Sequence, residues 1–368
     1  MTDDNAHALL AAKRREHVID ALARDGAVRI SQLVDDLGVT PVTLRRDLAQ
    51  MERDGVLVRV HGGAVPSKGA AAAAAAASEA ASPPEQRTIA VLVPSLNYYW
   101  PGVVRGMEAE ARARGLKVVL RGASYELQDE RPVLERLVAS EDISGLIVAP
   151  NTDTPHAQDV VRWLHESGIP TVFVEREMVS PDGAPVESVV TDHGLGAMLA
   201  ARHLAALGHR RVGLVLSRNS PTSRKIAAGW HQAVEDLQLE PARNAATILP
   251  DRASVDFTSE VNIALDSMMD AGITGLLVHS DPEAMAVVDL ALNRGISVPD
   301  DLSIIAYDDE VAQLFTPALT AVSPPRASVG RSAVDLLLHR MGSIDRPVHR
   351  VQLSPQLIVR DSTAAPRA

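Results

Sequence analysis

Arginine side chains gather on one face of a short predicted helix near the start of the sequence. Leu44, Leu48 and Met51 recur at the spacing of successive helical turns, so the segment between Pro41 and Gly55 predicts a helix with one buried stripe. Guanidinium groups pair bidentately with guanine, so the opposite face could read DNA bases. At about 100° per residue, that face carries Val42, Arg46, Ala49 and Arg53, with Arg45 at its edge. The alternative is a solvated face whose arginines pair with Asp47, Glu52 and Asp54.

Two further helices precede this segment. Residues 14–24 predict a first helix that Gly26 closes, and Ser31 is expected to cap a second helix over residues 32–37. Gly38 makes the turn, and Thr40 caps the third helix, which begins with proline, a residue favoured at the first helical position. Two short helices, a glycine turn and a third helix with outward arginines predict a helix-turn-helix.

A predicted wing follows the third helix. Residues 56–60 are typical of a strand, and His61-Gly62-Gly63 of a tight turn. Arg59 and His61 are expected near the tip of the wing, where cations suit DNA phosphates.

Composition divides the chain into a front unit, a linker and a larger rear unit. The 368 residues carry a net charge of −11, yet residues 1–66 carry nine Lys/Arg against ten Asp/Glu, so the acidic excess lies downstream. Residues 67–87 contain eight consecutive alanines, Ala70 to Ala77, and predict a linker. The chain length suits two or three globular units.

Several classes of protein are excluded or disfavoured. The sequence contains no cysteine, which removes disulfides, thiol nucleophiles and thiolate metal sites. It has no apolar run of 18 residues, and its first twenty residues lack the order of a signal peptide, so we expect a cytoplasmic protein without a membrane segment.

The rear unit alternates short apolar strands with amphipathic helices. Such a series predicts parallel sheets covered on both faces, and more than eight strands favour two doubly wound lobes over one large sheet. Ligands of these folds bind at the carboxyl ends of the strands. The predicted strands cover residues 88–93, 116–120, 145–149, 171–174, 188–191, 211–216, 274–279 and 302–307.

The front unit resembles the winged helix-turn-helix of the DeoR family. The resemblance is carried by SQLVDDLGVTPVTLRRDLAQMERDGVLVRVHGGAV, which includes an arginine-arginine-aspartate recognition helix and a histidine-glycine-glycine-alanine wing. It implies sequence-specific binding of double-stranded operator DNA. The residues expected at the DNA are Thr40, Val42, Thr43, Arg45, Arg46 and Arg53, with Arg59 and His61 near the backbone.

Residues 88–363 are similar to the effector domain of the LacI/GalR repressors, itself similar to periplasmic sugar-binding proteins. The matching strings include HLAALGHRRVGLVLS, GISVPDDLSIIAYDD and LSPQLIVRDST, spread over the whole unit. The resemblance implies an α/β architecture of periplasmic-binding-protein type I. Its two doubly wound lobes are expected at about 88–180 plus 323–345, and about 181–322 plus 346–363. The chain is therefore interpreted as one family's DNA reader fused to another family's sensor.

The resemblance places a ligand between the lobes, most simply a sugar. Asp308 is the strongest candidate, because a buried carboxylate beside an arginine makes strong directional hydrogen bonds to sugar hydroxyls. Three departures from the family pattern affect the ligand: Ala149 at a polar position, Glu175 before Arg176 where aspartate is common, and Pro324 in place of glutamine. The expected ligand-binding residues are Pro94, Asn97, Tyr98, Trp100, Arg121, Asn151, Glu175, Arg176, Arg224, Trp230, Ser280, Asp281 and Asp308.

The sequence thus predicts a homodimeric transcriptional regulator, a repressor of a carbohydrate-use operon, with no cofactor and no metal. Ligand is expected to close the lobes around hinge segments near 149–151, 190–192 and 324. An alternative is a regulator that senses a phosphosugar, a nucleoside or a partner protein, since Arg121, Arg176 and Arg224 could meet a phosphate. A sugar-processing enzyme is the remote alternative, because no Walker loop, His-Glu-x-x-His or Gly-x-Ser-x-Gly motif occurs. A transport-linked binding protein is disfavoured by the DNA reader.

Overall fold

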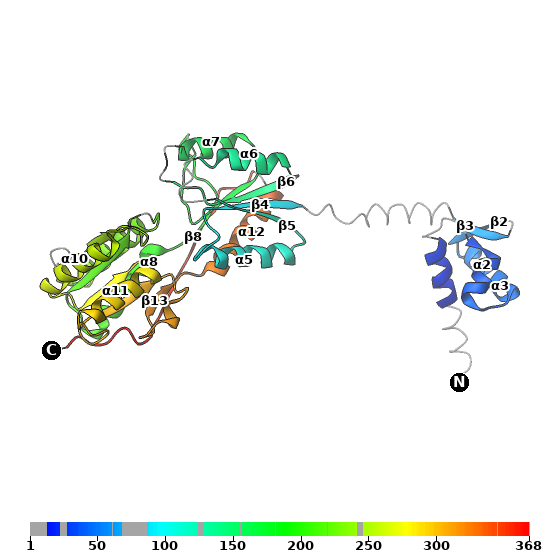
Figure 1. Ribbon diagram of the computed structural model, residues 1–368. Coiled ribbons are helices and arrows are strands. Elements are labelled where there is room, and N and C mark those ends of the chain that lie inside the picture. Colours follow the sequence, from blue (N-terminus) through cyan, green and yellow to red (C-terminus); the bar gives the residue numbers. More distant parts are fainter. Residues whose placement is uncertain are drawn as a thin grey trace. The chain divides into compact units, whose positions relative to one another are not determined.

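The structure divides into two units, Met1–Gln86 and Arg87–Ala368. It is a computed structural model that describes residues 13–22, 28–60, 62–67, 87–123, 129–140, 142–152, 154, 156–180, 182–218, 220–240, 246–343 and 345–367 (Figure 1). His61 and the eight-alanine run lie outside the described residues.

The first unit is a winged helix-turn-helix, as predicted. A helix over residues 13–22 is followed by β1 (Val28–Arg29), α2 (Ile30–Leu37), α3 (Pro41–Arg53), β2 (Leu57–Val60) and β3 (Gly63–Pro66). The strands form an antiparallel sheet in the order β1-β3-β2. Leu44, Leu48 and Met51 are buried and pack with Val18 and Leu33, so the predicted stripe on α3 faces the core.

The local signals at the ends of α2 and α3 are those that the sequence indicates, with one exception, and Gly26, predicted to close the first helix, lies outside the described residues. Thr40 Oγ1 accepts a hydrogen bond from the Thr43 amide at 3.3 Å and caps α3. Gly38 ends α2 in the left-handed conformation, with φ 62°. Ser31 does not cap α2, because the helix begins one residue earlier, at Ile30.

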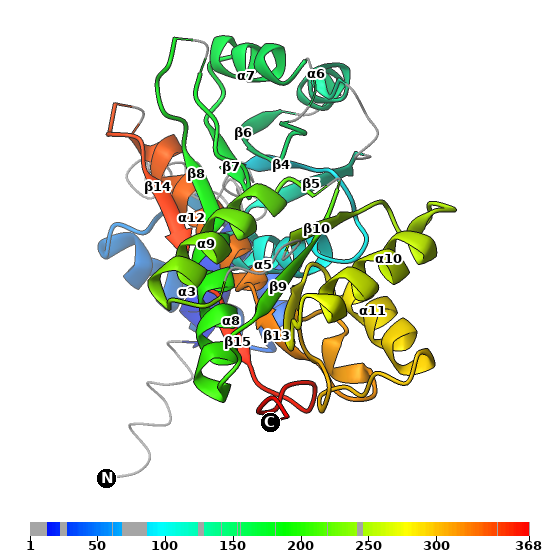
Figure 2. The ribbon, with the colours of Figure 1, turned by 90° about the vertical axis from the view of Figure 1, so that its left-hand side faces the viewer.

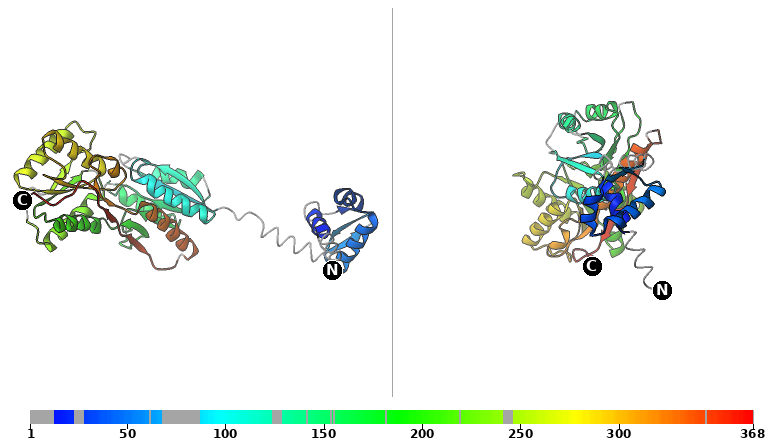
Figure 3. Two further views of the ribbon diagram at one scale, coloured as in Figure 1. Left: turned by 90° about the horizontal axis from the view of Figure 1, so that it is seen from below. Right: turned by 90° about the vertical axis from the view of Figure 1, so that its right-hand side faces the viewer.

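The second unit contains two six-stranded sheets (Figure 2; Figure 3). The first has the order β14-β8-β7-β6-β4-β5 and is parallel throughout. Its strands are β4 (Thr88–Val93), β5 (Lys117–Gly122), β6 (Ile143–Val148), β7 (Thr171–Val174), β8 (Ser188–Thr191) and β14 (Arg350–Leu353). The second has the order β10-β9-β11-β12-β13-β15 and is parallel except for the β13–β15 pair. Its strands are β9 (Val212–Ser217), β10 (Ala246–Leu249), β11 (Gly275–Val278), β12 (Ser303–Tyr307), β13 (Thr320–Ser323) and β15 (Gln356–Ile358).

Helices cover both faces of each sheet, which buries the near-continuous apolar strands. In the first lobe, α5 (Trp100–Ala113) and α12 (Arg326–Gly342) pack on one face, and α6 (Arg131–Ser140) and α7 (Ala157–Glu166) on the other. In the second lobe, α8 (His193–Leu207) and α9 (Ser223–Asp236) lie opposite α10 (Phe257–Asp270) and α11 (Asp281–Asn293). A short 3₁₀ turn, η1 (Ala312–Leu314), follows β12. Gly106 and Gly330 let α5 and α12 approach closely, since a Cβ on either would lie 2.0–2.1 Å from a backbone oxygen of the other helix. Within the described residues, no helix has the length and apolarity needed to cross a membrane.

The lobe boundaries differ from the predicted ones. Residues 181–191 and 346–353 were expected in the second lobe, but β8 pairs with β7 and β14 pairs with β8, so both strands extend the first sheet. The chain therefore crosses between the lobes at 192, at 324–325 and at 354–355. Residues 149–151 were expected at a hinge but follow β6 within the first lobe. Strand alternation in a sequence does not reveal which sheet a strand joins, because pairing is decided by distant segments.

Candidate functional site

The exposed face of α3 carries the arginines predicted to read DNA. Arg45 and Arg46 are exposed, and neither makes a hydrogen bond or ion pair with any described residue. Val42 is 71% exposed on the same helix, which suits contact with a thymine methyl group. Thr43 is half-buried, and its hydroxyl lies 2.9 Å from that of Thr40, so these two threonines order the start of the helix.

Two ion pairs orient α3 within the first unit. The Arg14 guanidinium donates to Asp47 at 2.8 Å and ties the helix over residues 13–22 to α3. Glu52 accepts from the Arg59 amide at 2.9 Å and from its Nε at 2.6 Å, which joins the wing to α3. These bonds lower the pKa of Glu52. Arg53 donates to Gln50 within the helix.

A cavity of about 720 Å³ lies between the two lobes of the second unit. Its lining residues follow the carboxyl ends of β4, β6, β7, β9, β10, β11 and β12, the edge at which doubly wound folds bind ligands. The lining combines three aromatic rings with carboxylates, arginines and hydroxyls, a mixture suited to a polar ligand with apolar faces. It consists of Tyr98, Tyr99, Trp100, Asn151, Glu175, Arg176, His193, Ser217, Arg218, Ser220, Pro221, Thr222, Arg224, Asp251, His279, Ser280 and Asp308.

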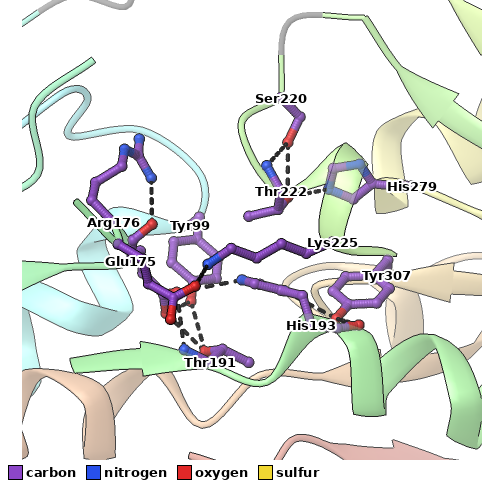
Figure 4. Close-up of polar contacts among 11 residues, drawn as sticks. Tyr99, Glu175, Arg176, Thr191, His193, Ser220, Thr222, Lys225, His279 and Tyr307 are labelled. Carbon is purple, nitrogen blue, oxygen red and sulfur yellow. Dashed lines mark hydrogen bonds and ion pairs between the residues drawn. The ribbon is translucent and has the colours of Figure 1, made fainter. Parts of the chain in front are cut away.

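Glu175 is the centre of a buried hydrogen-bond network (Figure 4). Its carboxylate accepts from the hydroxyls of Tyr99 at 2.5 Å and Thr191 at 2.7 Å, and from the Thr191 amide at 3.1 Å. His193 Nε2 lies 3.3 Å from the same carboxylate, and His193 Nδ1 lies 3.0 Å from the Tyr307 hydroxyl. Burial opposes ionisation, but the bonds from His193, Tyr99 and Thr191 outweigh it and lower the pKa of Glu175 to about 2. Glu175 is thus an ionised group held within the first lobe by Tyr99 and Thr191 and joined to the second lobe by His193.

Arg176 presents an unsatisfied donor at the cavity. Its Nε donates to the Pro150 carbonyl and its Nη1 to the Glu175 carbonyl, each at 2.9 Å. The guanidinium carbon lies 5.8 Å from the centre of the Trp100 ring, a cation–π contact. Arg176 is 4% exposed, and its buried Nη2 has no partner among the described residues. A buried donor of this kind requires a water or a ligand acceptor.

Asp308 is a buried carboxyl group without a donor. Asp308 is 6% exposed and lines the cavity. Its side chain accepts no hydrogen bond from the described part of the chain. Burial, followed by the charge of Asp281, raises its pKa well above the ordinary value, although Arg326 opposes the shift. Ligand hydroxyls would supply the donors that this carboxyl lacks.

His279 supplies the opposite wall with a neutral ring. Burial, with a contribution from His193, lowers its pKa to about 3. Its Nε2 lies 3.4 Å from the Thr222 hydroxyl, which lies 2.9 Å from the hydroxyl of Ser220. Its buried Nδ1 has no partner among the described residues.

Further polar contacts close the cavity across the lobes. The Asp281 amide at the start of α11 donates to the Tyr98 hydroxyl at 3.2 Å. Lys225 Nζ on α9 lies 2.5 Å from Glu177 Oε2 in the first lobe. Among the described residues, no group of three or more histidine or carboxylate side chains could bind a metal ion.

Comparison with known protein families finds a matching family for each unit. Residues 14–68 match the DeoR-like helix-turn-helix domain, and residues 201–363 match the periplasmic binding protein-like domain. The chain is 24% identical over 331 residues to the arabinose metabolism transcriptional repressor of Geobacillus stearothermophilus, across 87% of this chain and 86% of that protein. It is 25% identical over 283 residues to the transcriptional repressor PurR of Vibrio campbellii, across 75% and 81%.

Solved structures share the fold of the second unit. A LacI family regulator from Enterococcus faecium with bound ribose is 25% identical, with a TM-score of 0.61 over 76% of this chain and 99% of that one. The regulator CelR in complex with cellobiose is 24% identical, with a TM-score of 0.63 over 80% and 91%. The chain is a transcriptional regulator with a DeoR-like reader and a LacI-type effector domain. The relatives named above are transcriptional repressors.

The regulator brings eight of the predicted ligand residues together at the cavity. They are Tyr98, Trp100, Asn151, Glu175, Arg176, Arg224, Ser280 and Asp308. Glu175 differs in environment from the expectation, because its carboxylate is already occupied by protein donors.

Five predicted ligand residues lie outside the cavity lining. Pro94, directly after β4, is buried, whereas Asn97 and Arg121 are exposed. The Arg121 guanidinium donates to the Leu120 carbonyl. Trp230 is 2% exposed in the core of the second lobe, where α8 and α9 pack on the sheet. Asp281 turns away and accepts from the amides of residues 309–312. The structure therefore places these five residues in the core, in a contact that supports a loop, or at the surface, and not at the cavity.

Nine lining residues of the regulator are not among the predicted ligand-binding residues. Those at strand ends could have been found from the rule that ligands bind there, notably His279 after β11 and Ser217 at the end of β9. Of the others, His193 begins α8, and the rest lie in loops whose course a sequence does not define. The nine are Tyr99, His193, Ser217, Arg218, Ser220, Pro221, Thr222, Asp251 and His279.

Proposed function

We propose that the regulator is a repressor of carbohydrate-use genes whose affinity for operator DNA is set by a polyhydroxylated ligand in the inter-lobe cavity. The observation that carries this proposal is the donor-free, buried carboxyl of Asp308 opposite the acceptor-free Nη2 of Arg176 in one cavity. Vicinal hydroxyls donate and accept at once, so a sugar satisfies both groups. The aromatic rings of Tyr98 and Trp100 suit the C–H faces of such a ligand.

The relatives support the same class of ligand. Ribose is bound in the Enterococcus faecium regulator and cellobiose in CelR, and a further relative is an arabinose metabolism repressor. Because the sequence identity to these relatives is near 25%, we propose a class of ligand and not one particular sugar. We place the regulator in the cytoplasm, where its DNA target lies.

On the DNA side, we assign base reading to α3. Arg45 and Arg46 have no described partner within the protein, so their guanidinium groups are available to guanine. Thr40, Val42, Thr43 and Arg53 belong to the same proposed surface, and Arg59 and His61 to the wing. A homodimer formed through the effector units would present two such readers to the two halves of an operator.

The ligand test is a thermal shift of the full chain against monosaccharides, disaccharides, polyols and nucleosides. A ligand at a hundredfold excess over its Kd contributes about 2.7 kcal/mol, so the melting temperature of the effector unit should rise by several degrees. Asp308→Ala should lose this rise, and Trp230→Phe, a change in the second-lobe core, should keep it. Absence of any rise across the neutral sugars would contradict the proposed ligand class.

A phosphosugar is the second candidate, favoured by one observation. Arg218, which the sequence did not single out, lines the cavity together with Arg224, so two arginines lie near the start of α9. Asp251 on the same cavity wall offsets part of their charge. Paired sugars and sugar phosphates in the thermal shift distinguish the candidates, since only a phosphosugar site should prefer the phosphate and lose that preference in Arg218→Gln.

A further inference from the structure

Arg326 joins the ligand-facing loop of the second lobe to the first lobe. It is the first residue of α12, directly after the crossover from β13. Its guanidinium donates to the Asp308 carbonyl and, over 3.2 Å, to the Asp309 carbonyl, and its Nε lies 3.0 Å from Glu310 Oε1. All three contacted residues follow β12 in the second lobe, whereas α12 packs on the first sheet.

The loop that Arg326 contacts has an unfavourable backbone conformation. Asp308 and Asp309 have φ of 97° and 54°, the left-handed region that non-glycine residues rarely adopt. Asp281 secures the amide side of this loop, because its carboxylate accepts from the amides of residues 309–312 at 2.7–3.2 Å. Arg326 secures the carbonyl side. Such a conformation persists only where the surroundings fix it, so these two side chains, together with the Arg360–Asp309 ion pair, maintain the turn that carries Asp308.

The other side of Arg326 contacts a cavity residue of the first lobe. Its guanidinium carbon lies 5.9 Å from the centre of the Tyr99 ring, and the Tyr99 hydroxyl donates to Glu175. Gly102 on α5 leaves room for this side chain, since a Cβ there would lie 3.1 Å from it. Arg326 therefore lies between Tyr99 and Asp308, which line the cavity from different lobes.

We infer that Arg326 is a positioning residue that sets the relative orientation of the lobes by fixing the Asp308–Asp309 turn to the start of α12. Its two terminal nitrogens donate to two carbonyls of one loop, and its Nε forms an ion pair with Glu310 on the same loop. A planar guanidinium orients such a set of contacts better than an ammonium group. A ligand that engages Asp308 acts on the same turn, and Arg326 passes the effect to α12. This second step rests on the proposed function, whereas the orienting role does not.

The test measures the distance between the lobes without ligand or DNA. Because the chain has no cysteine, Glu166→Cys on α7 and Glu260→Cys on α10, both exposed, give two unique spin-label sites. In the full-length protein, mixed with an excess of unlabelled chain so that distances between protomers of the proposed dimer are suppressed, pulsed electron paramagnetic resonance should give one main distance. Arg326→Met keeps the apolar stem and should broaden or shift this distribution, and Arg326→Lys should restore it in part. An unchanged distribution in Arg326→Met would overturn the inference.

Two controls separate orientation from stability. Arg346→Met removes an arginine of similar burial whose ion pair with Glu187 lies within the first lobe, so it should lower the melting temperature and leave the distance unchanged. If Arg326→Met fails to fold, Glu310→Gln weakens the same bridge from the other lobe and should broaden the distribution more weakly. An unchanged distance in Glu310→Gln would then count against the inference. Absence of any ligand response in the wild type, together with a changed lobe distance in Arg326→Met, would contradict only the proposed function.

Discussion

Two buried carboxyl groups of the cavity have opposite electrostatic environments. Glu175 accepts four hydrogen bonds from protein donors, whereas Asp308 accepts none from the described residues. The pKa of Glu175 is therefore lowered and that of Asp308 is raised. Glu175 stabilises the ligand-free protein, and Asp308 remains available to a ligand.

The first prediction concerns Glu175→Gln. A pKa lowered from 4.5 to about 2 means that the carboxylate contributes stability above pH 4.5, which is lost as the pH falls toward 2. The variant should be less stable than the wild type by about 3 kcal/mol at pH 7, with the difference shrinking between pH 4.5 and 2. Urea unfolding followed by tryptophan fluorescence reports this, because Trp100, Trp163 and Trp230 all lie in the effector unit. A difference that does not vary with pH would refute the assignment.

The second prediction concerns Asp308, whose pKa is shifted in the opposite direction to that of Glu175. Because the folded-state pKa of Asp308 is raised, its contribution is most favourable below its unfolded pKa and is lost as the pH rises toward the folded pKa. Asp308→Asn removes this dependence, so the variant should gain stability relative to the wild type as the pH rises above 4. The same unfolding series measures it. A wild type more stable than the variant at pH 8 would show that the carboxyl has a protein partner.

At the scale of elements, α3 depends on a partner helix for its position. The Arg14–Asp47 ion pair is the described polar link between residues 13–22 and α3, and Asp47 is 6% exposed. Arg46 is exposed on the same helix and contributes nothing to this packing. Variants of Asp47 and Arg46 should therefore distinguish the positioning of α3 from its contact with DNA bases.

Asp47→Ala should loosen α3, whereas Arg46→Ala should leave it intact. Loss of a charged hydrogen bond at a nearly buried site costs about 2 kcal/mol, so amide hydrogen exchange in α3 should accelerate in Asp47→Ala. Loss of one bidentate base contact costs about 1–3 kcal/mol, so Arg46→Ala should weaken binding to a DNA site selected from a random library by roughly 10- to 100-fold. Asp36→Ala, an exposed change on α2, is the control for both measurements. Unaltered DNA affinity in Arg46→Ala would remove α3 from the reading surface.

At the scale of the whole molecule, we expect the length of the segment that joins the two units to affect DNA binding more than its residue types do. The eight alanines from Ala70 to Ala77 lie outside the described residues, but their count limits how far a reader can extend from its effector unit. Deleting them shortens the maximum reach by roughly 28 Å, close to the helical turn of DNA that separates operator half-sites.

Deletion of Ala70 to Ala77 should therefore change the operator spacings that the proposed dimer accepts. Affinity for half-sites two turns apart should fall more than affinity for half-sites one turn apart, because the short tether lowers the effective concentration of the second reader. Gel-shift titrations on a spacing series measure this. An eight-residue Gly/Ser replacement, which keeps the length, should behave like the wild type, and equal losses at all spacings would contradict a role of the tether in spacing.

Local signals in the sequence were sufficient wherever structure depends on neighbouring residues. The capping threonine before Pro41, the turn at Gly38 and the stripe of Leu44 and Leu48 all act within a few residues. The eight predicted apolar runs of the rear unit likewise formed strands, because each buries itself between two layers of helices. Four short strands, β10, β13, β14 and β15, were not predicted, since their apolar runs are short and their pairing partners are distant.

The sequence by itself determined the two kinds of unit, the reading helix and the strand ends at which a ligand site forms. Only the tertiary structure decided that Trp230 packs in the core, that Asp281 supports a loop and that Glu175 is already occupied by protein donors. It also placed β8 and β14 in the first sheet and Arg326 beneath Asp308. The physical reason is that helix caps and apolar stripes act over a few residues. Strand pairing and the partners of a buried charge are instead set by segments far apart in the chain.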